Sequence, residues 1–517
     1  MVSQLDQDTS TVLASIREWR NSFVPINRFP LEVLCLVPTN LSSETDVIHA
    51  GSVCRHWRKT FIQHAALWSK LDLSLKRTRL FVETRLERAK GAPLDITSAY
   101  LGRAEILGLL SPHAQQFRSL NIVFALWSHI QKLSEAASGP LPLLQELNIR
   151  VIDFDPLAPE EMNHPSLPLF AGATNLKKFH LHSDGLPYLD HFTFPNLTTF
   201  QLFVIPEEEA FHVSQLLDFL GATPTLQDVY VSIQAESSLA GVPPGRVVVL
   251  PNVERLSVIE EEPGYDIAAH ISCPSAKHAW LIQERVFGDP IPPEAFPVSA
   301  TWNAIPPQYM ANQIDEVQLW IEISPRVSCH ISFISSDSTV LELGHSTAAA
   351  GDEEEPGVTP GQEYVEVLSQ ASRSIRTHPL LANVKRLTID DLSPGLTPNE
   401  LTGVANEVGQ LFKSMGRLEK LTLSALDLQP YLAPFIDLPE FDDVKQSYAY
   451  PRIDSLTIGP ERKDFQMSSK AAIVEFAKSQ HALGVPFDRV EFRTEETPTD
   501  MVELLQPWVG AVSSCGS

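Results

Sequence analysis

One short pattern recurs along most of this 517-residue chain and constrains its fold more than any other feature. An apolar residue is followed three positions later by a second and, two positions after that, by a third. The last two alternate with polar residues, which predicts a short strand with one buried face. Proline often stands just ahead, as at Pro142 and Pro251. The triplets are Phe117/Leu120/Ile122, Leu144/Leu147/Ile149, Leu176/Phe179/Leu181, Leu197/Phe200/Leu202, Leu226/Val229/Val231, Val253/Leu256/Val258, a weaker Ile314/Val317/Leu319, Val384/Leu387/Ile389, Leu418/Leu421/Leu423, Ile453/Leu456/Ile458 and Phe487/Val490/Phe492.

The intervals between triplets are long enough to hold a second element. First positions are 27, 32, 21, 29 and 27 residues apart in the first half and 34, 35 and 34 at the end. Helical spacing of apolar residues lies between triplets, which predicts units of one strand and one loop or helix that stack on their neighbours. A non-repetitive α/β domain remains the alternative, because short apolar alternation occurs in any strand. The predicted helices are Phe211–Leu220, Val365–Ile375, Leu401–Met415 and Ala471–Gln480.

The triplet resembles the Leu-x-x-Leu-x-Leu part of a leucine-rich repeat, over residues 111–510. The Asn or Cys that the family places three positions after the last Leu is missing, since Leu426 stands there after Leu423. The resemblance therefore implies an irregular α/β solenoid. A loop-rich interruption is expected near 285–365, where prolines cluster at 290–293 and 306–307 and a predicted mobile acidic loop spans Ser346–Gly361.

The first 75 residues have a different, helical pattern. Apolar residues at helical spacing predict an amphipathic helix over 9–23, within a segment 1–24. Pro30 suits the first turn of a second helix, since its missing N–H needs no partner there. A further helix is predicted from about Asp46, with Ala50, Cys54, Trp57 and Phe61 in one continuous stripe. These elements predict a bundle of three short helices, too small to bury much area, so part of its apolar face is expected to be an interface.

Three blocks of this region, in order, resemble the F-box. They are Phe29-Pro30-Leu31-Glu32-Val33-Leu34, Val53-Cys54-Arg55-His56-Trp57-Arg58 and Leu67-Trp68, within residues 25–75. In the family this module docks on the Skp-type adaptor of a cullin-RING ubiquitin ligase. A helical linker is expected over 76–110. The alternative is that these apolar side chains simply form the core of the bundle. Carried over by position, the adaptor-binding residues are Pro30, Leu34, Val53, Cys54, Trp57, Leu67 and Trp68.

Charge and cysteine content exclude several classes. The chain has 39 Lys and Arg against 64 Asp and Glu, a net charge of −25, the opposite of what a nucleic-acid-binding protein needs. No apolar run of 18 residues or signal peptide is recognised, so no membrane partner is expected. Five cysteines form no CxxC pair, which favours reduced thiols in the cytoplasm or nucleus.

Motifs for catalysis and metal binding are weak. Gly344-His345-Ser346-Thr347-Ala348 imitates the nucleophile elbow of an esterase, and Asp390 and His481 follow in the order of a triad, but no HGG loop is present. His180 and His182 alternate on one predicted strand and are too few for a metal site. We therefore expect no catalytic residue, metal or cofactor.

The sequence predicts a mixed α/β chain, with a small N-terminal three-helix F-box module followed by an irregular leucine-rich-repeat-like α/β solenoid. Such a chain is expected to be a non-catalytic substrate-recognition subunit of a Skp–cullin–F-box ubiquitin ligase. Its partners would be a Skp-type adaptor, through it a cullin, and an unidentified target protein. The alternative is a repeat scaffold with a degenerate F-box and no ligase role.

Overall fold

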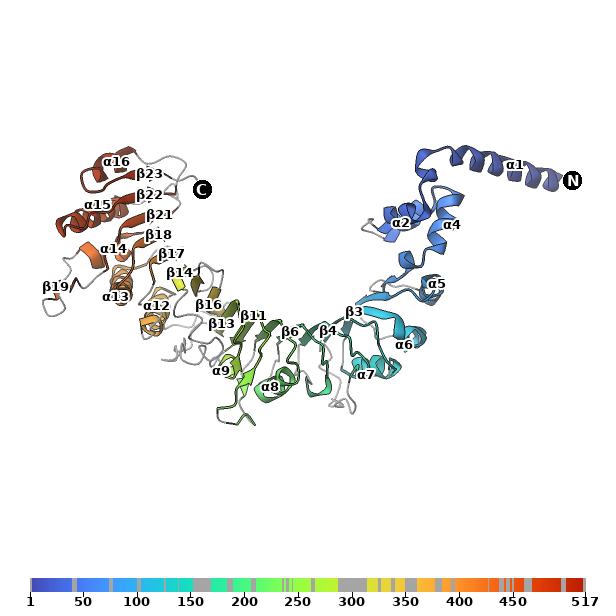
Figure 1. Cartoon of the computed structure of the whole chain (residues 1–517), viewed down its shortest axis with the longest axis horizontal. Helices are drawn as coiled ribbons and strands as arrows, with labels where there is room; N and C mark the ends of the chain where they lie inside the picture. The colour runs from blue at the N-terminus through green and yellow to red at the C-terminus, as the bar shows by residue number, and fades with distance from the viewer. Residues whose placement is uncertain are drawn as a thin grey trace. The chain divides into compact units, whose positions relative to one another are not determined.

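The computed structural model of the whole chain is drawn in Figure 1. It divides into two compact units, Met1–Thr199 and Phe200–Ser517. The structure describes residues 2–39, 44–73, 78–99, 104–124, 127–137, 139–151, 169–183, 189–205, 211–234, 237–238, 241–243, 245–261, 266–286, 314–323, 327–335, 340–348, 360–376, 384–391, 396–425, 427–436, 441–442, 447–448, 451–459, 467–493 and 499–514.

Helices open the first unit. Their bounds are α1 (Val2–Ser22), η1 (Pro25–Arg28), α2 (Leu31–Thr39), α3 (Glu44–Gly51), α4 (Arg55–Gln63) and η2 (Ala65–Trp68). The helix predicted over 9–23 is therefore longer and starts near the N-terminus. Pro30 is the residue before α2, and its carbonyl accepts the first helical bonds from Val33 and Leu34.

The single helix predicted from Asp46 is wrong, because the chain breaks it into α3 and α4. Tight turn bonds from Ser52 to His49 and from Val53 to Ala50 end α3. Cys54 then takes an extended conformation, with φ −157° and ψ 170°, and precedes α4. The predicted apolar stripe survives this break, since both helices turn it toward one core.

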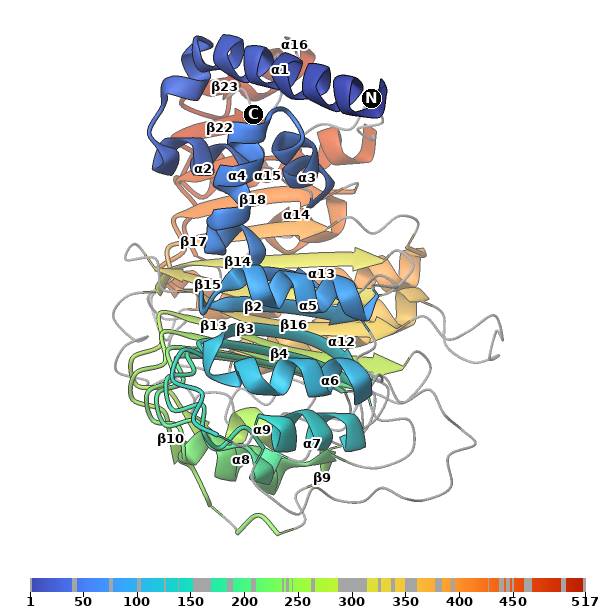
Figure 2. The same cartoon turned by 90° about the vertical axis from the view of Figure 1, so that its right-hand side faces the viewer.

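A parallel sheet follows in the same unit, with helices along one side (Figure 2). Strands pair parallel in the order β1–β2–β3–β4–β5. The sheet begins at residue 70, so the segment 76–110, expected to be a helical linker, contains a full strand. Its strands are β1 (Lys70–Asp72), β2 (Leu94–Ala99), β3 (Phe117–Phe124), β4 (Glu146–Val151) and β5 (Lys178–Ser183), and its helices are α5 (Arg79–Ala89), α6 (Ala104–Leu110), η3 (Ser111–Gln116), α7 (Trp127–Ala136) and η4 (Leu189–His191).

The second unit is also mixed α/β. Its strands are β6 (Thr199–Val204), β7 (Phe211–His212), β8 (Asp228–Ile233), β9 (Ser237–Ser238), β10 (Val248–Val249), β11 (Arg255–Glu261), β12 (Ile271–Ser272), β13 (His278–Val286), β14 (Ile314–Ile323), β15 (Val327–Ser335), β16 (Val340–Ala348), β17 (Arg386–Asp391), β18 (Lys420–Ala425), β19 (Phe441–Asp442), β20 (Ser447–Tyr448), β21 (Ser455–Ile458), β22 (Arg489–Phe492) and β23 (Val512–Ser514). Its helices are α8 (Val213–Gly221), α9 (Asp266–Ala269), α12 (Pro360–Arg376), α13 (Pro398–Ser414), α14 (Gln429–Ile436), α15 (Met467–Ala482) and α16 (Thr499–Leu505). The four helices predicted from spacing are confirmed as α8, α12, α13 and α15.

The segment expected to be rich in loops contributes three long strands to this sheet. β8, β11, β13 and β16 pair parallel, and β16–β15–β14 pair antiparallel. Parallel pairing then continues through β14, β17, β18, β21, β22 and β23. The meander therefore enters the sheet in reverse order, between β13 and β17. The predicted mobile acidic loop lies largely in 349–359, outside the described residues.

A repeated tight turn comes directly before many of the strands. The first residue of a triplet donates its N–H to the carbonyl three residues earlier, as from Leu144 to Leu141 and from Val253 to Leu250. Proline suits the second position of such a turn because its φ is already set. The side chain of Asn175 donates to Pro142 O at 2.8 Å, and that of Asn252 donates to Pro224 O at 3.0 Å. These bonds tie each turn to the one before it.

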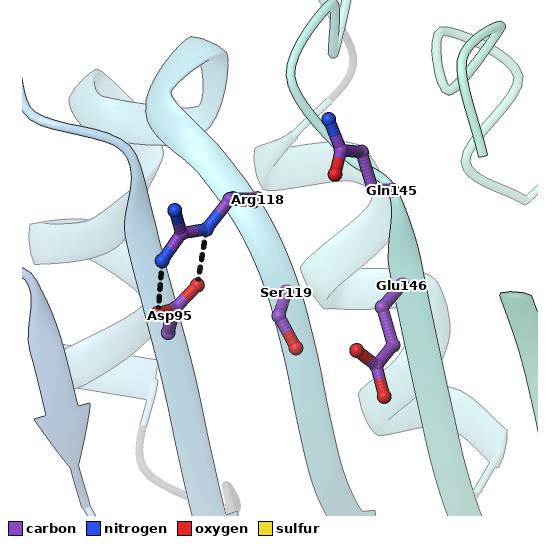
Figure 3. A pocket seen from close by; sticks show the side chains of 5 residues that line it. All are labelled: Asp95, Arg118, Ser119, Gln145 and Glu146. Carbon is purple, nitrogen blue, oxygen red and sulfur yellow. Dashed lines mark hydrogen bonds and ion pairs between the residues drawn. The ribbon is translucent and has the colours of Figure 1, made fainter. Parts of the chain in front are cut away.

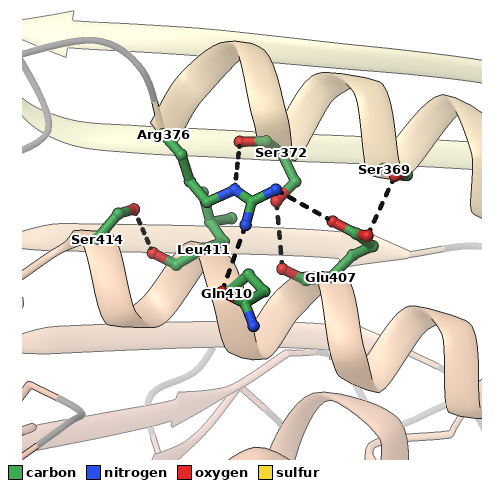
Figure 4. Close-up of polar contacts among 7 residues, drawn as sticks. All are labelled: Ser369, Ser372, Arg376, Glu407, Gln410, Leu411 and Ser414. Carbon is green, nitrogen blue, oxygen red and sulfur yellow. Dashed lines mark hydrogen bonds and ion pairs between the residues drawn. The ribbon is translucent and has the colours of Figure 1, made fainter.

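Helices α12 and α13 pack together through a polar cluster that links their facing sides (Figure 4). Ser369 Oγ donates to Glu407 Oε1 at 3.1 Å, and Ser372 Oγ donates to the Glu407 carbonyl at 3.2 Å. The Arg376 guanidinium lies 3.7 Å from Glu407 Oε2. The same pair of elements buries Val404, Val408 and Val367 in the apolar core.

Candidate functional site

The N-terminal helices share one small apolar core. Leu34, Trp57, Phe61 and Leu67 are buried together, although they come from α2, α4 and η2. Ala50, Cys54 and Trp68 pack partly buried against this cluster. Because helices α2, α3 and α4 all contact one another, this core fixes how their outer sides are presented (Figure 2).

A hydrogen-bond relay positions Trp57 and joins the core to α1. The indole N–H of Trp57 donates to Asn27 Oδ1 at 2.6 Å, and Asn27 Nδ2 donates to the Asn21 carbonyl at 2.7 Å. A buried indole needs such an acceptor, since an unpaired N–H would lose its hydration without compensation. The sequence analysis did not identify Asn27, and its position one turn before Pro30 carries no distinctive signal.

Trp68 links the helical segment to the sheet that follows. Its indole N–H donates to the Phe61 carbonyl at 2.8 Å. The guanidinium carbons of Arg88 and Arg85, both on α5, lie 4.5 Å and 5.5 Å from its ring centre. Two cations of its own chain therefore lie close to the ring, and such cation–π contacts stabilise an aromatic side chain.

Around this core, apolar side chains remain uncovered. Val53 is 67% exposed and Leu36 is 58% exposed, although both lie beside residues of the core. Large apolar side chains are exposed on α2, on α3 and in the turn after α3, and exposed apolar surface is a feature of interaction sites in proteins. We call these side chains the uncovered apolar set; its members are Leu31, Val33, Leu36, Val37, Ile48 and Val53.

The seven predicted docking residues divide between core and surface. Pro30 and Val53 are exposed, and Cys54 and Trp68 are half-buried. The three remaining predicted residues belong to the core: Leu34, Trp57 and Leu67. Most of the uncovered apolar set was missed, because helical spacing alone does not say which side of α2 faces inward.

Basic side chains stand next to the uncovered apolar set. Arg55, Arg58 and Lys59 on α4 are exposed. Arg55 has one acidic neighbour, Glu18 on α1, at 4.0 Å, and both side chains are largely in solvent. This edge would favour a partner with acidic residues at its rim.

The thiol of Cys35, on α2, is unsuited to nucleophilic chemistry. Cys35 is buried. Burial first, and the neighbouring carboxylate of Glu32 second, raise the pKa of its thiol above the usual value. The reactive thiolate is therefore disfavoured.

The esterase-like residues do not assemble into a triad. Ser346 lies on β16 and Asp390 on β17, and two strands, β15 and β14, separate them in the sheet. Three strand spacings put their backbones about 14 Å or more apart, whereas a triad needs hydrogen-bond reach between neighbouring members. His481 lies on α15, with its ring 5.6 Å from that of Trp508.

No metal site is present in the part of the chain that the structure describes. His180 and His182 lie on β5, opposite Asn148 and Arg150 of β4. Among the described residues no three His, Cys, Asp or Glu side chains gather in a group that could hold a metal ion.

A hollow of about 370 Å³ lies where β2, β3 and β4 begin (Figure 3). Asp95, Arg118, Ser119, Gln145 and Glu146 line it. Arg118 donates Nε to Asp95 Oδ1 at 2.8 Å and Nη2 to Oδ2 at 2.5 Å. This bidentate ion pair neutralises the Arg118 guanidinium, so the hollow offers no unpaired positive charge to an anion.

Comparison with known proteins gives no match, either to a family model or to a curated protein. Within the described residues, no helix is both long and apolar enough to cross a membrane.

Proposed function

We propose that this chain is the substrate-recognition subunit of a Skp–cullin–F-box ubiquitin ligase. The supporting observation is the uncovered apolar set, which lies on and between the helices that form an already complete core. A core of this size leaves little reason for Leu36 and Val53 to be apolar unless another subunit covers them. The three sequence blocks that resemble the F-box supply the identity of that subunit, a Skp-type adaptor, and through it a cullin.

In this role the chain acts without catalytic residues of its own. The helical module holds the adaptor, the sheet region holds a target protein, and the tether raises the effective concentration of target lysines near a charged ubiquitin-conjugating enzyme. An irregular leucine-rich-repeat-like solenoid is our proposal for the region after the module. The repeated turn and parallel strand support it.

The sheet offers a polar surface for the target. In β18, β21 and β22, Lys420, Ser455 and Arg489 lie in one row across neighbouring strands. They alternate along their strands with buried Leu421 and Leu456. A row of partly exposed, hydrogen-bonding side chains on a rigid sheet suits recognition of a protein surface.

Binding of a purified Skp-type adaptor to the full chain tests the proposal. We expect the wild type to bind and the double variant Leu36→Asp with Val53→Asp to lose affinity on the order of a hundredfold, since both carboxylates would be buried unpaired. The control is Leu80→Asp, which introduces one carboxylate of the same kind at an exposed leucine of α5 and should leave binding unchanged. Failure of the wild type to bind the adaptor refutes the ligase role.

A repeat scaffold without a ligase role is the second candidate. The observation that favours it is the burial of Leu34, Trp57 and Leu67 within the module, because a bundle with no partner would also need these residues. A chain that does not bind the adaptor but keeps a folded helical module would fit this candidate.

A further inference from the structure

Helix α1 carries an apolar seam that the described part of its own chain does not cover. Trp19 is 67% exposed and Ile16 is 55% exposed, and Val12 and Phe23 are similarly open to solvent. Figure 1 shows α1 running as a straight rod beyond α2 and α4 of the same unit, with its N-terminal end free of them. Most of the stability of a helix in a protein comes from packing of its apolar face, and the apolar face of α1 has little packing in this unit.

The seam has the spacing of a coiled coil. Thr9, Val12, Ile16, Trp19 and Phe23 follow one another at intervals of three, four, three and four residues. Thr9 and Ile16 thereby occupy one core position of a heptad and Val12 and Trp19 the other, and Phe23 continues the spacing directly after the end of α1. The 21 residues of α1 give about 30 Å of helix, room for about three heptads.

Charges beside the seam are separated along the helix. The N-terminal half carries Asp6 and Asp8 and no basic residue, whereas the C-terminal half carries Arg17, Glu18 and Arg20. Asp6 and Arg20 occupy the same flanking heptad position, two heptads apart. Glu18 lies outside the seam, on the side that faces Arg55.

We infer that α1 pairs with α1 of a second copy of this chain as an antiparallel coiled coil. A two-fold axis beside residue 14 sets Val12 of one copy against Ile16 of the other, and Thr9 against Trp19. The same register brings Asp6 next to Arg20 of the other copy, twice by symmetry. A parallel pair would leave these charges about 20 Å apart along the helix, without a complementary partner.

This dimer is independent of the proposed ligase role, because α1 precedes the helical core and the uncovered apolar set. It would give one particle two copies of the adaptor-binding module and two sheet regions. Two linked target-binding surfaces would raise avidity for a target with repeated sites.

The mass of the full chain in solution, measured by sedimentation equilibrium, provides the first test. We expect twice the 57.3 kDa mass of one chain, falling toward the monomer on dilution. Ile16→Asp should weaken the dimer on the order of a hundredfold, because it places a carboxylate in the seam of each copy. Ser10→Asp, on the exposed outer side of α1, is the matched control and should leave the mass unchanged. A monomeric wild type, or a dimer indifferent to Ile16→Asp, overturns the proposal.

The orientation is tested by mixing two charge-reversed chains. Asp6→Arg alone sets Arg against Arg in an antiparallel homodimer, and Arg20→Asp alone sets Asp against Asp. In a mixed dimer of the two variants, both charge pairs between the helices again join an Arg to an Asp. The sequence of each helix is the same in the mixed dimer as in its homodimer, so only the pairing between the helices differs. We expect mixed dimers to exceed the statistical half of the population, by native mass spectrometry. A statistical mixture overturns the antiparallel pairing.

Discussion

Leu34→Ala tests whether a residue of the helical module stabilises its core or only its surface. Leu34 is 0% exposed and packs with Trp57 and Phe61. Removing a fully buried leucine side chain costs about 2–5 kcal/mol of unfolding free energy. A module of about 45 residues has only about 2–7 kcal/mol to lose, at about 0.05–0.15 kcal/mol per residue. The variant should therefore remove most of the stability of the module, while the strands of the second unit stay as stable as in the wild type.

Hydrogen exchange followed by mass spectrometry measures this directly. Peptides from α2 and α4 should lose protection in Leu34→Ala, whereas peptides from β17 and β18 should exchange as in the wild type. Val53→Ala is the control, since an exposed side chain changes stability by no more than about 0.5 kcal/mol. Unchanged protection of α2 in Leu34→Ala, or equal effects of the two variants, would refute the burial argument. If α2 does lose protection, a loss of adaptor binding in Leu34→Ala reports unfolding of the module and not a lost contact.

Four further outcomes follow from the structure. Arg376→Met removes the partner of Glu407 between α12 and α13, and because both side chains are partly solvated the loss should be about 1 kcal/mol in urea unfolding. Asn252→Ala breaks the bond to the preceding turn and should cost about 0.5–1.5 kcal/mol in the same assay. Burial raises the pKa of the Cys273 thiol to about 12, so peptide mapping after alkylation of the native chain at pH 8 should find Cys54 modified and Cys273 unmodified. The same raised pKa contributes stability that is complete below the ordinary thiol pKa near 9.0 and is lost as pH rises toward 12.

The mixed α/β class and the position of most strands could be predicted because the triplet reports burial directly. Its first residue closes a tight turn and its last two point from the strand into the core, so all three must be apolar. Val253, Leu256 and Val258 are buried in this way. The proline ahead of the triplet, as at Pro251, occupies the second position of the tight turn. Because it acts only on its own turn, it can be recognised from the sequence.

Elements without the full triplet escaped prediction. β1 has one buried apolar residue, Leu71, and β2 has two, Leu94 and Ile96, so neither is distinguishable from a helix edge or a loop. The reversed order of β14, β15 and β16 could not be foreseen either. The spacing of apolar residues predicts where a strand lies but does not say which other strand it pairs with.

By itself, the sequence determined the strands that carry the full triplet, four of the helices between them and where a small helical module precedes the sheet, because local spacing of apolar residues sets these. Only the tertiary structure decided that Leu34 and Trp57 lie inside the module while Leu36 and Val53 remain outside, and that α1 keeps Ile16 and Trp19 uncovered. All six are apolar residues within segments that the sequence predicts to be helical. Which of them faces a neighbouring helix depends on contacts between distant parts of the chain, and those contacts are not encoded in the local pattern.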